Sequence, residues 1–439
     1  MCSGRPGRAR LRADSNRDVT GHRRNRRRSR GRHAAMIREA VRPGTTATVL
    51  YGLIRAAMSE PAADPRAGLG LDGIEWNEVS DLAAQHGVRP LLHQALTALP
   101  DVDVAAAFRE QLRDSCAAIA RRNLYLSTEL MRVLAALETA GIEALAFKGP
   151  ALAVLAYGNL ARREFVDLDI LVHRQDMGGA RQCLSSVGFV SRYALNRAQE
   201  RIIIRRNRTY DLLSTNRQVA LDLHWAFIPR YFQLAQEPDD LWQRLVQVRL
   251  AGALVNSLPP DDQLIVVCLH GSRSGWVQLK WVCDVASASR LIGDADWDRV
   301  LRRSRRWGAE RCLLLGLALV RDLLGIVLPA PIVGALERDE AVEHLRGRVS
   351  TWMIAAPGRP RSRTEETSLY AALASTRRTR LRIWGGLVLA PTHEDAEHLS
   401  LGQGVAFLYA FLRPFRLLIK YLRRLPDAPR SVSAAPPGG

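Results

Sequence analysis

The chain has 439 residues, of which 47% are hydrophobic and 24% charged, proportions typical of a soluble globular protein with a large core in two or three domains. Its six cysteines form no C-x-x-C pair, and its longest apolar runs fall well short of the roughly 20 residues of a membrane-spanning helix. These observations exclude a zinc knuckle, a disulfide framework and a transmembrane segment. The net charge is +19, but residues 1–35 contribute +10 of it through 12 arginines and two aspartates.

Residues 1–35 form an arginine-rich leader with almost no large apolar side chains, and we expect this leader to be disordered. Its charge suits binding to nucleic acid or to an acidic surface; beyond the leader we expect no nucleic-acid partner. The favoured interpretation is that translation starts at Met36 and that the leader is not part of the protein. Because the leader lacks the apolar segment of a signal peptide and the cysteines are scattered, a reducing, cytoplasmic location is predicted.

Residues 36–140 are predicted to form an N-terminal helical region. Apolar residues recur at helical spacing from Trp76 until His86-Gly87 ends the first clear helix, and a longer helix is predicted over residues 105–140. This long helix is expected to turn the following side chains inward: Leu124, Leu126, Leu130, Val133 and Leu134.

The pattern changes at Gly141, and residues 141–240 are predicted to form the core domain. Short strands are expected over residues 142–147, 167–172, 209–214 and 219–227, with helices over residues 150–157 and 176–187. This alternation predicts an α+β fold in which a small mixed sheet of four or five strands is flanked by N- and C-terminal helical regions.

Residues 241–345 are predicted to form a helical domain, with helices over residues 261–272, 277–291, 297–307 and 311–324. The acids Asp261 and Asp262 at the start of the first helix fit N-terminal caps better than metal ligands.

Residues 346–430 are predicted to be a linker and a C-terminal helical segment, and residues 431–439 a disordered tail. The segment contains a basic amphipathic helix over residues 404–425. Weak contact of this helix with an anionic membrane surface is one interpretation, and a solvated helix face is the favoured one.

The carboxylates Asp167 and Asp169 alternate with apolar residues in V-D-L-D-I-L-V, so a strand places both on one face. Neighbouring carboxylates repel each other unless a positive charge lies between them, and a divalent cation carrying a nucleotide triphosphate is a natural candidate. Upstream, Lys148 and Gly149 lie where a strand opens into a helix, a position at which a lysine and free backbone N–H groups can receive phosphate. Arg163 can complement the triphosphate charge; alternatively it neutralises the nearby aspartates.

Asp222, in V-A-L-D-L-H-W, is the candidate third carboxylate on a neighbouring strand. Together with Asp167 and Asp169 it would form a Mg²⁺ or Mn²⁺ site, because these ions prefer carboxylate oxygen ligands. Asp222 could also accept a proton from the acceptor hydroxyl. His224 shares the face of Asp222 and could contact substrate or orient that carboxylate, and a structural hydrogen bond is an equal alternative. His270 is expected to be an interior histidine.

With these residues the chain resembles the polymerase-beta-type nucleotidyltransferase superfamily, and more specifically the uncharacterised nucleotidyltransferase family, over residues 76–422. The motifs are A-F-K-G-P from Ala146, R-x-x-x-D-x-D-I-L-V from Arg163, L-D-L-H-W from Leu221 and L-H-G from Leu269. The resemblance implies a nucleotidyltransferase sheet between helical regions, with metal ligands at Asp167, Asp169 and Asp222. The superfamily usually carries Gly-Ser where this chain has Lys148-Gly149, so either Lys148 supplies the contact of the missing serine hydroxyl or no residue does.

We predict a metal-dependent nucleotidyltransferase that transfers a nucleoside monophosphate from an NTP, ATP among the candidates, to an acceptor. The acceptor is a small molecule, a glycan or a protein, since members of the family are bacterial and often accompany polysaccharide or peptide biosynthesis. The alternative is an inactive nucleotide- or partner-binding module on the same fold. Against that alternative, three buried negative charges without a ligand would only destabilise the fold.

Overall fold

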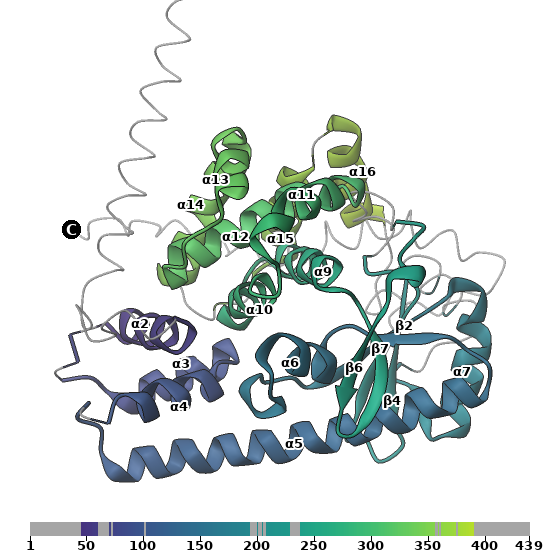
Figure 1. The fold of residues 1–439 in the computed structure, drawn as a ribbon, viewed down its shortest axis with the longest axis horizontal. Helices are drawn as coiled ribbons and strands as arrows, with labels where there is room; N and C mark the ends of the chain where they lie inside the picture. The colour runs from purple at the N-terminus through teal and green to yellow at the C-terminus, as the bar shows by residue number, and fades with distance from the viewer. Residues whose placement is uncertain are drawn as a thin grey trace, which may run out of the picture.

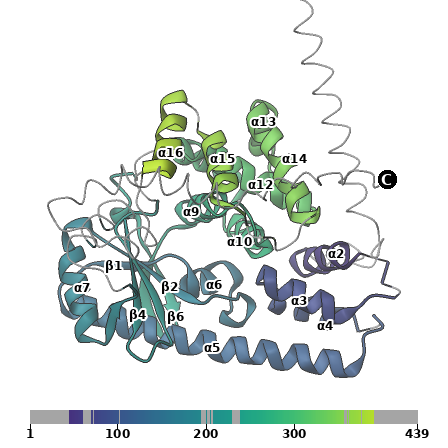
Figure 2. The same ribbon diagram turned by 180° about the vertical axis from the view of Figure 1, so that it is seen from behind.

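The computed structural model describes residues 45–59, 70–71, 73–100, 102–193, 200, 204, 208–228, 238–355, 359, 361–374 and 376–389. In this part of the chain, helices surround a small sheet (Figures 1 and 2). The predicted leader over residues 1–35, the basic helix over residues 404–425 and the tail over residues 431–439 lie outside the described residues. The predicted division into domains is not tested by this architecture and stays a prediction.

Helix α5 is the base of the molecule and extends beneath both the N-terminal helices and the sheet (Figure 1). Its C-terminal half buries Leu126, Leu130, Val133 and Leu137, three or four residues apart, on one face. The prediction for Leu124 is wrong: its side chain is 55% exposed, because two positions correspond to more than half a helical turn. The helices before the sheet are α2 (Thr46–Met58), α3 (Trp76–His86), α4 (Arg89–Ala98) and α5 (Ala106–Thr139).

The central sheet has the order β1-β2-β5-β4-β3, and among these neighbours β2 and β5 are parallel while the other pairs are antiparallel. The arrangement confirms the predicted small mixed sheet flanked by N- and C-terminal helical regions. Its strands are β1 (Ala144–Ala146), β2 (Asp167–Val172), β3 (Phe189–Ser191), β4 (Thr209–Ser214) and β5 (Ala220–His224). The connections contain helices α6 (Gly149–Tyr157) and α7 (Met177–Ser186) and the 3₁₀ turns Leu160–Arg162 and Arg174–Asp176.

A second sheet of two strands, β6 (Val246–Leu250) and β7 (Ala253–Ser257), follows the 3₁₀ turn Trp242–Arg244. No strand was predicted between residues 241 and 260, so this hairpin was missed. The segment V-Q-V-R-L alternates apolar and polar residues, which is the period of a strand. The hairpin is joined to β1 because the Ser257 hydroxyl donates a hydrogen bond to the carbonyl of Ala146 at 2.7 Å.

The remaining helices pack above the sheet and against α2 (Figures 1 and 2). One hydrophobic cluster joins residues of α2 to residues of the later helices, and a second cluster lies between α5, α7 and the central sheet. None of the helices in the described ranges combines the length and the apolar character that crossing a bilayer requires. The later helices are α9 (Pro260–Arg273), α10 (Leu279–Ser289), α11 (Trp297–Arg306), α12 (Glu310–Leu324), α13 (Ala330–Glu337), α14 (Glu340–Ala355), α15 (Arg363–Leu373) and α16 (Arg377–Leu389), with a 3₁₀ turn at Asp294–Asp296.

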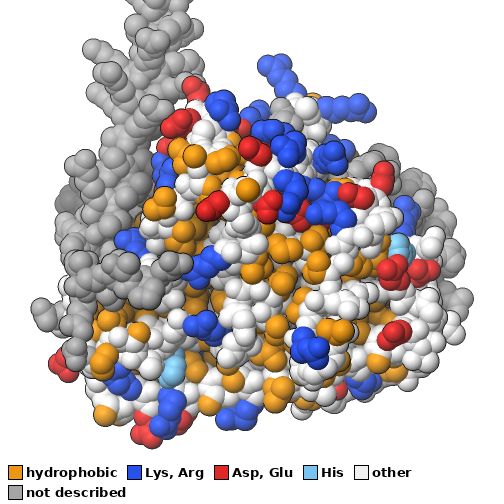
Figure 3. All heavy atoms as spheres, viewed as in Figure 1, with side chains coloured by type: hydrophobic (Ala, Val, Ile, Leu, Met, Phe, Trp, Pro, Cys, Tyr) orange, Lys and Arg blue, Asp and Glu red, His pale blue; other side chains and the backbone are white. Residues whose placement is uncertain are grey.

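Helix α11 has one buried face and one basic, exposed face. It buries Trp297, Val300 and Leu301. Figure 3 shows basic side chains gathered over this part of the molecule, with acidic side chains among them. Part of the positive charge outside the leader therefore lies on a solvated helix face, which carries Arg299, Arg302, Arg305 and Arg306.

The acids at the start of α9 belong to a buried ion-pair network and do not cap the helix as predicted. Asp262 is completely buried and accepts hydrogen bonds from Arg303 Nε at 2.7 Å, Arg303 Nη2 at 3.0 Å and Trp307 Nε1 at 3.1 Å. Arg244 pairs with both Asp261 and Asp262. The network fixes α9 against α11, because a buried carboxylate requires charged or hydrogen-bonding partners.

A buried histidine predicts how stability changes with pH. His86 is fully buried, its Nδ1 accepts the backbone N–H of Leu279 at 3.1 Å, and burial lowers its pKa from 6.5 to about 4. Below pH 6.5 the unfolded chain binds a proton at His86 that the folded protein does not bind, so stability falls as the pH falls. We expect the free energy of unfolding to lose on the order of 3 kcal/mol from this residue between pH 6.5 and 4.

Urea unfolding of the wild type and His86→Gln across this pH range measures the effect, because subtracting the two profiles removes the titration of the carboxylates. The expected difference profile is flat above pH 6.5 and slopes below it. Parallel profiles for the two proteins would contradict the assignment to His86.

Candidate active site

The strand register brings the predicted carboxylates together on one face of the central sheet. Asp169 on β2 lies directly opposite Asp222 on β5, and Asp211 on β4 lies directly opposite Asp222 from the other side. Because register partners point to the same face, the three carboxylates form a row across three strands. Asp167 shares this face, two residues before Asp169. The other face is apolar and belongs to the cluster that includes α5, through Leu168, Ile170, Leu221 and Leu223.

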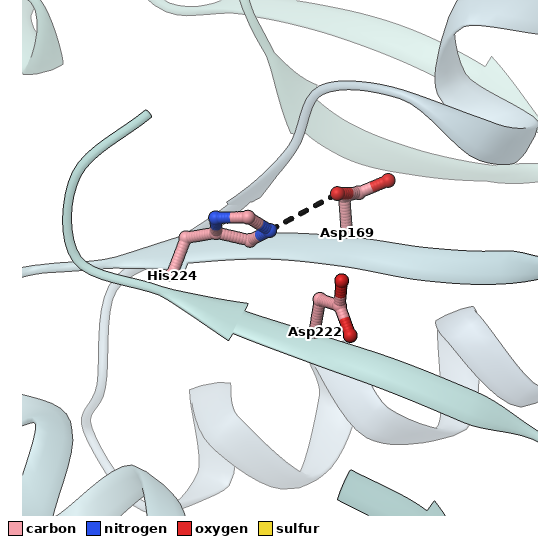
Figure 4. Close-up of side chains that lie close together, drawn as sticks. All are labelled: Asp169, Asp222 and His224. Carbon is pink, nitrogen blue, oxygen red and sulfur yellow. Dashed lines mark hydrogen bonds and ion pairs between the residues drawn. The ribbon is translucent and has the colours of Figure 1, made fainter. Parts of the chain in front are cut away.

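Asp169 is the most heavily bonded of these carboxylates. Its Oδ1 accepts the Lys148 ammonium at 2.6 Å and a hydrogen bond from His224 Nε2 at 3.0 Å, and its residue is only 3% exposed. Figure 4 shows His224 directed at Asp169 from the end of β5, with Asp222 beside the pair. The ring of Phe147 packs edge-on against His224 with ring centres 5.1 Å apart, which holds the imidazole in this direction.

These side chains offer a potential metal site of slightly different composition from the predicted one. One potential ligand atom from each of Asp169, Asp222 and His224 lies within 4.8 Å of the others. The predicted set was Asp167, Asp169 and Asp222, so the structure groups two of these three with His224. Asp167 lies on the same face at the edge of this group, and its role as a ligand stays a prediction. Carboxylate oxygens in this number fit Mg²⁺ or Mn²⁺.

The electrostatics of the row differ from one carboxylate to the next. Burial disfavours the ionised form of Asp169, but the Lys148 ammonium and the His224 hydrogen bond outweigh burial and lower its pKa. Asp222 has no such partner among the described residues: burial, followed by the charges of Asp169 and Asp211, raises its pKa well above the usual range. Burial and Asp169 likewise raise the pKa of Asp167. Among the described residues, Asp222 therefore lacks a positive partner, and a divalent cation would supply that charge.

The predicted Lys148-Gly149 turn lies at the N-terminus of α6, against the beginning of β2. Gly149 has φ +50°, and a β-carbon at this position would lie 3.1 Å from the carbonyl oxygen of Asp167. A side chain is disfavoured both by the left-handed backbone and by the close approach to the strand. The absence of a side chain lets the first turn of α6 and its free N–H groups lie beside the carboxylates.

Arg163, the predicted phosphate ligand, is buried and already paired. Its Nε and Nη2 donate to the two carboxylate oxygens of Asp284 at 2.7 and 2.9 Å, and the Tyr157 hydroxyl donates to Asp284 Oδ1 at 2.8 Å. Burial alone would lower the pKa of Arg163, but Asp284 raises it. Its Nη1 is buried and has no partner among the described residues. The predicted phosphate contact of Arg163 would therefore fall to Nη1 and stays a prediction.

Three residues of this region were missed in the sequence. Asp211 could have been found from the β4–β5 hairpin, since a turn at residues 215–218 sets it opposite Asp222. Lys280 and Asp284 are one helical turn apart on α10, a spacing that places them on one face. Lys280 is half-buried; burial, followed by the charge of Arg163, lowers its pKa, and Asp167 is among the carboxylates that act on it.

A mixed sheet that presents carboxylates beside the N-terminus of a helix is the arrangement that the resemblance to nucleotidyltransferases implied, and the family match shows that class. Residues 72–325 match the sequence model of the family described as uncharacterised nucleotidyltransferase. The chain belongs to this family, as its motifs indicated, and is a transferase enzyme. No curated protein and no solved structure matches the chain.

Proposed function

We propose that the protein transfers a nucleoside monophosphate from an NTP to a hydroxyl or phosphate of an acceptor, with Mg²⁺ or Mn²⁺ bound by Asp169 and Asp222. The observation that carries this proposal is the register pairing of these two carboxylates beside the Lys148 ammonium and the N-terminus of α6. We include Asp167 as a further ligand, because it shares the face of Asp169 and because burial, followed by the charge of Asp169, raises its pKa. The bound cation would neutralise charge on the attacking and leaving oxygens.

The chain's own residues bind and orient the substrates in this proposal. Lys148 and the backbone N–H groups at the start of α6 receive the donor phosphates. Arg163, through Nη1, and Lys280 add positive charge near Asp167. Asp222, with its raised pKa, is suited to accept the proton of the acceptor hydroxyl, and His224 keeps Asp169 oriented.

We infer a small molecule, a glycan or a protein as acceptor, ATP or another NTP as donor, and the cytoplasm as location. The cysteines at positions 116, 183, 268, 283 and 312 are unpaired, which suits a reducing compartment.

The test is a calorimetric titration of ATP, GTP, CTP and UTP into the full-length protein, with magnesium and again with EDTA. We expect one nucleotide to bind, and only with magnesium, because the donor phosphates reach the carboxylate row through the cation. A folded protein that binds none of the four nucleotides would refute the transfer reaction. It would leave the alternative, an inactive partner-binding module on the same fold.

A further inference from the structure

A small cavity lies between the carboxylate face and the last turn of α9, and we call it the α9 cavity. Four polar side chains line it: Lys148 and His224 from the sheet side, and His270 and Arg273 from α9. Phe147 and Phe227 are among its apolar walls. The α9 cavity therefore touches the candidate active site through two of the residues that bind Asp169, while its other two polar residues have no part in the proposed mechanism.

The charge of the α9 cavity is opposite to that of the neighbouring row of carboxylates. Among the described residues that line it, none is acidic, whereas Lys148 and Arg273 are both cationic. Within the described part of the chain the half-buried Arg273 guanidinium makes no ion pair or hydrogen bond. Burial, followed in the case of His270 by Lys148, lowers the pKa of both His224 and His270.

One of the residues that line this cavity, His224, has a buried polar atom without a partner among the described residues. His224 is only 5% exposed, and its Nδ1 is buried without a hydrogen-bond partner among the described residues. Figure 4 shows that the ring directs Nε2 to Asp169, while its second nitrogen lies on the opposite edge. A buried polar atom without a partner is unfavourable and is expected to be paired with water or with ligand. Two of the residues that line the α9 cavity, His224 and Arg273, therefore have hydrogen-bonding groups that no described residue of the chain pairs with.

The size of the α9 cavity limits what can enter. Its volume is about 20 Å³, which admits one water-sized group and excludes a nucleobase or a sugar ring. A single oxygen of an oxyanion fits both the size and the two cationic donors, since arginine and lysine are common phosphate ligands.

We propose that the α9 cavity is a subsite for a phosphoryl oxygen of the donor polyphosphate, bound by Arg273 and Lys148 and oriented by His270. The inference rests on the proposed function and deepens it, because the same nucleotide would bind the carboxylate row through its cation and the α9 cavity through its phosphates. In this arrangement a residue of α9, Arg273, contacts the phosphates of the donor. The protein then prefers triphosphates to monophosphates through a residue outside the sheet.

The test uses the full-length wild type, Arg273→Gln, Arg273→Lys and the matched control Arg302→Gln, which removes a positive charge from the exposed face of α11. The probes are inorganic tripolyphosphate, the magnesium complexes of the four NTPs and the corresponding monophosphates, each measured by titration calorimetry. We expect Arg273→Gln to lower the affinity for tripolyphosphate and for the bound NTP at least about tenfold, which is the effect of losing one charge-assisted hydrogen bond. Arg273→Lys should restore part of the loss. Monophosphate binding and Arg302→Gln should be unchanged.

Equal affinities of Arg273→Gln and wild type for tripolyphosphate and NTP would overturn the subsite. If Arg273→Gln binds tripolyphosphate more weakly than the wild type but binds NTP equally well, the assignment of the subsite to the donor would be overturned. A phosphate on the acceptor would then be indicated. If the wild type binds no nucleotide while tripolyphosphate still depends on Arg273, the proposed function fails and the oxyanion site stands. His270→Gln provides a second variant should circular dichroism show that Arg273→Gln does not fold, and unchanged tripolyphosphate and NTP affinities in it would then overturn the subsite.

Discussion

Asp222→Asn is expected to abolish magnesium-dependent nucleotide binding and, in the absence of divalent cations, to raise the melting temperature at pH 8. Asp222 lies between Asp169 and Asp211 in the row and, in the part of the chain that the structure describes, has no positive partner of the kind that Lys148 gives Asp169. Since its pKa is raised in the folded protein, its ionisation opposes folding as the pH rises. Asparagine keeps the shape and removes the charge. Nucleotide affinity should fall more than about a hundredfold, which exceeds the effect of mutating a residue that only orients a metal ligand.

Asp169→Asn is the informative contrast, because it should lose nucleotide binding to the same extent while lowering the melting temperature. It leaves the Lys148 ammonium and His224 Nε2 without their carboxylate in a buried site. The exposed Asp298→Asn on α11 serves as the control and should change neither property. Calorimetry with the bound nucleotide and thermal melting in EDTA measure both quantities. A destabilised Asp222→Asn that binds nucleotide like the wild type would show that the row is purely structural.

Arg303→Met is expected to destabilise the protein by about 2–3 kcal/mol, because it removes one of the two arginines that pair with the buried Asp262 carboxylate and leaves only Arg244 and Trp307 as its partners among the described residues. Arg303 binds both oxygens of the fully buried Asp262 and reaches Asp240 at 2.6 Å. Burial raises the pKa of Asp262 even though the arginines oppose the shift, so the carboxylate is costly to ionise without them. Urea unfolding of the variant and the wild type measures the difference in the free energy of unfolding.

The double variant Arg303→Met/Asp262→Asn should recover most of this loss, because it removes the buried charge together with its partner. Arg302→Met, on the exposed side of the same helix, should stay within about 0.5 kcal/mol of the wild type. If Arg303→Met were within about 1 kcal/mol of the wild type, the network would be an incidental arrangement of charges.

Sequence patterns predicted the elements wherever one period dominated. The strands over residues 167–172 and 209–214 have the predicted bounds, and the long helix over residues 105–140 is found at Ala106–Thr139. The β6–β7 hairpin was missed because a clear alternation was read as part of a helical region. Leu124 was misplaced because an apolar side chain was assigned to the core regardless of its angle around the helix.

The candidate site was predictable only in part, because sequence patterns are local and the partners of the site residues are distant in the sequence. The D-x-D strand, the lysine-glycine turn and Asp222 each have a local signature. The partners of these residues come from distant elements: Asp284 reaches Arg163 from α10, and Arg273 reaches the α9 cavity from α9. Asp211 was missed because its place opposite Asp222 follows only once the turn of the β4–β5 hairpin is used to set the register.

The sequence by itself determined the periods, the turns and the residues that carry charge, because these follow from backbone geometry over a few neighbouring positions. It thereby identified the family and the carboxylates. Only the tertiary structure decided which charges meet. The parallel pairing of β2 with β5 set Asp169 opposite Asp222. The packing of α9 and α10 over the sheet placed Arg273 and Lys280 near this face. Burial then made those pairings decisive, because a charge removed from water depends on the partner that the fold provides.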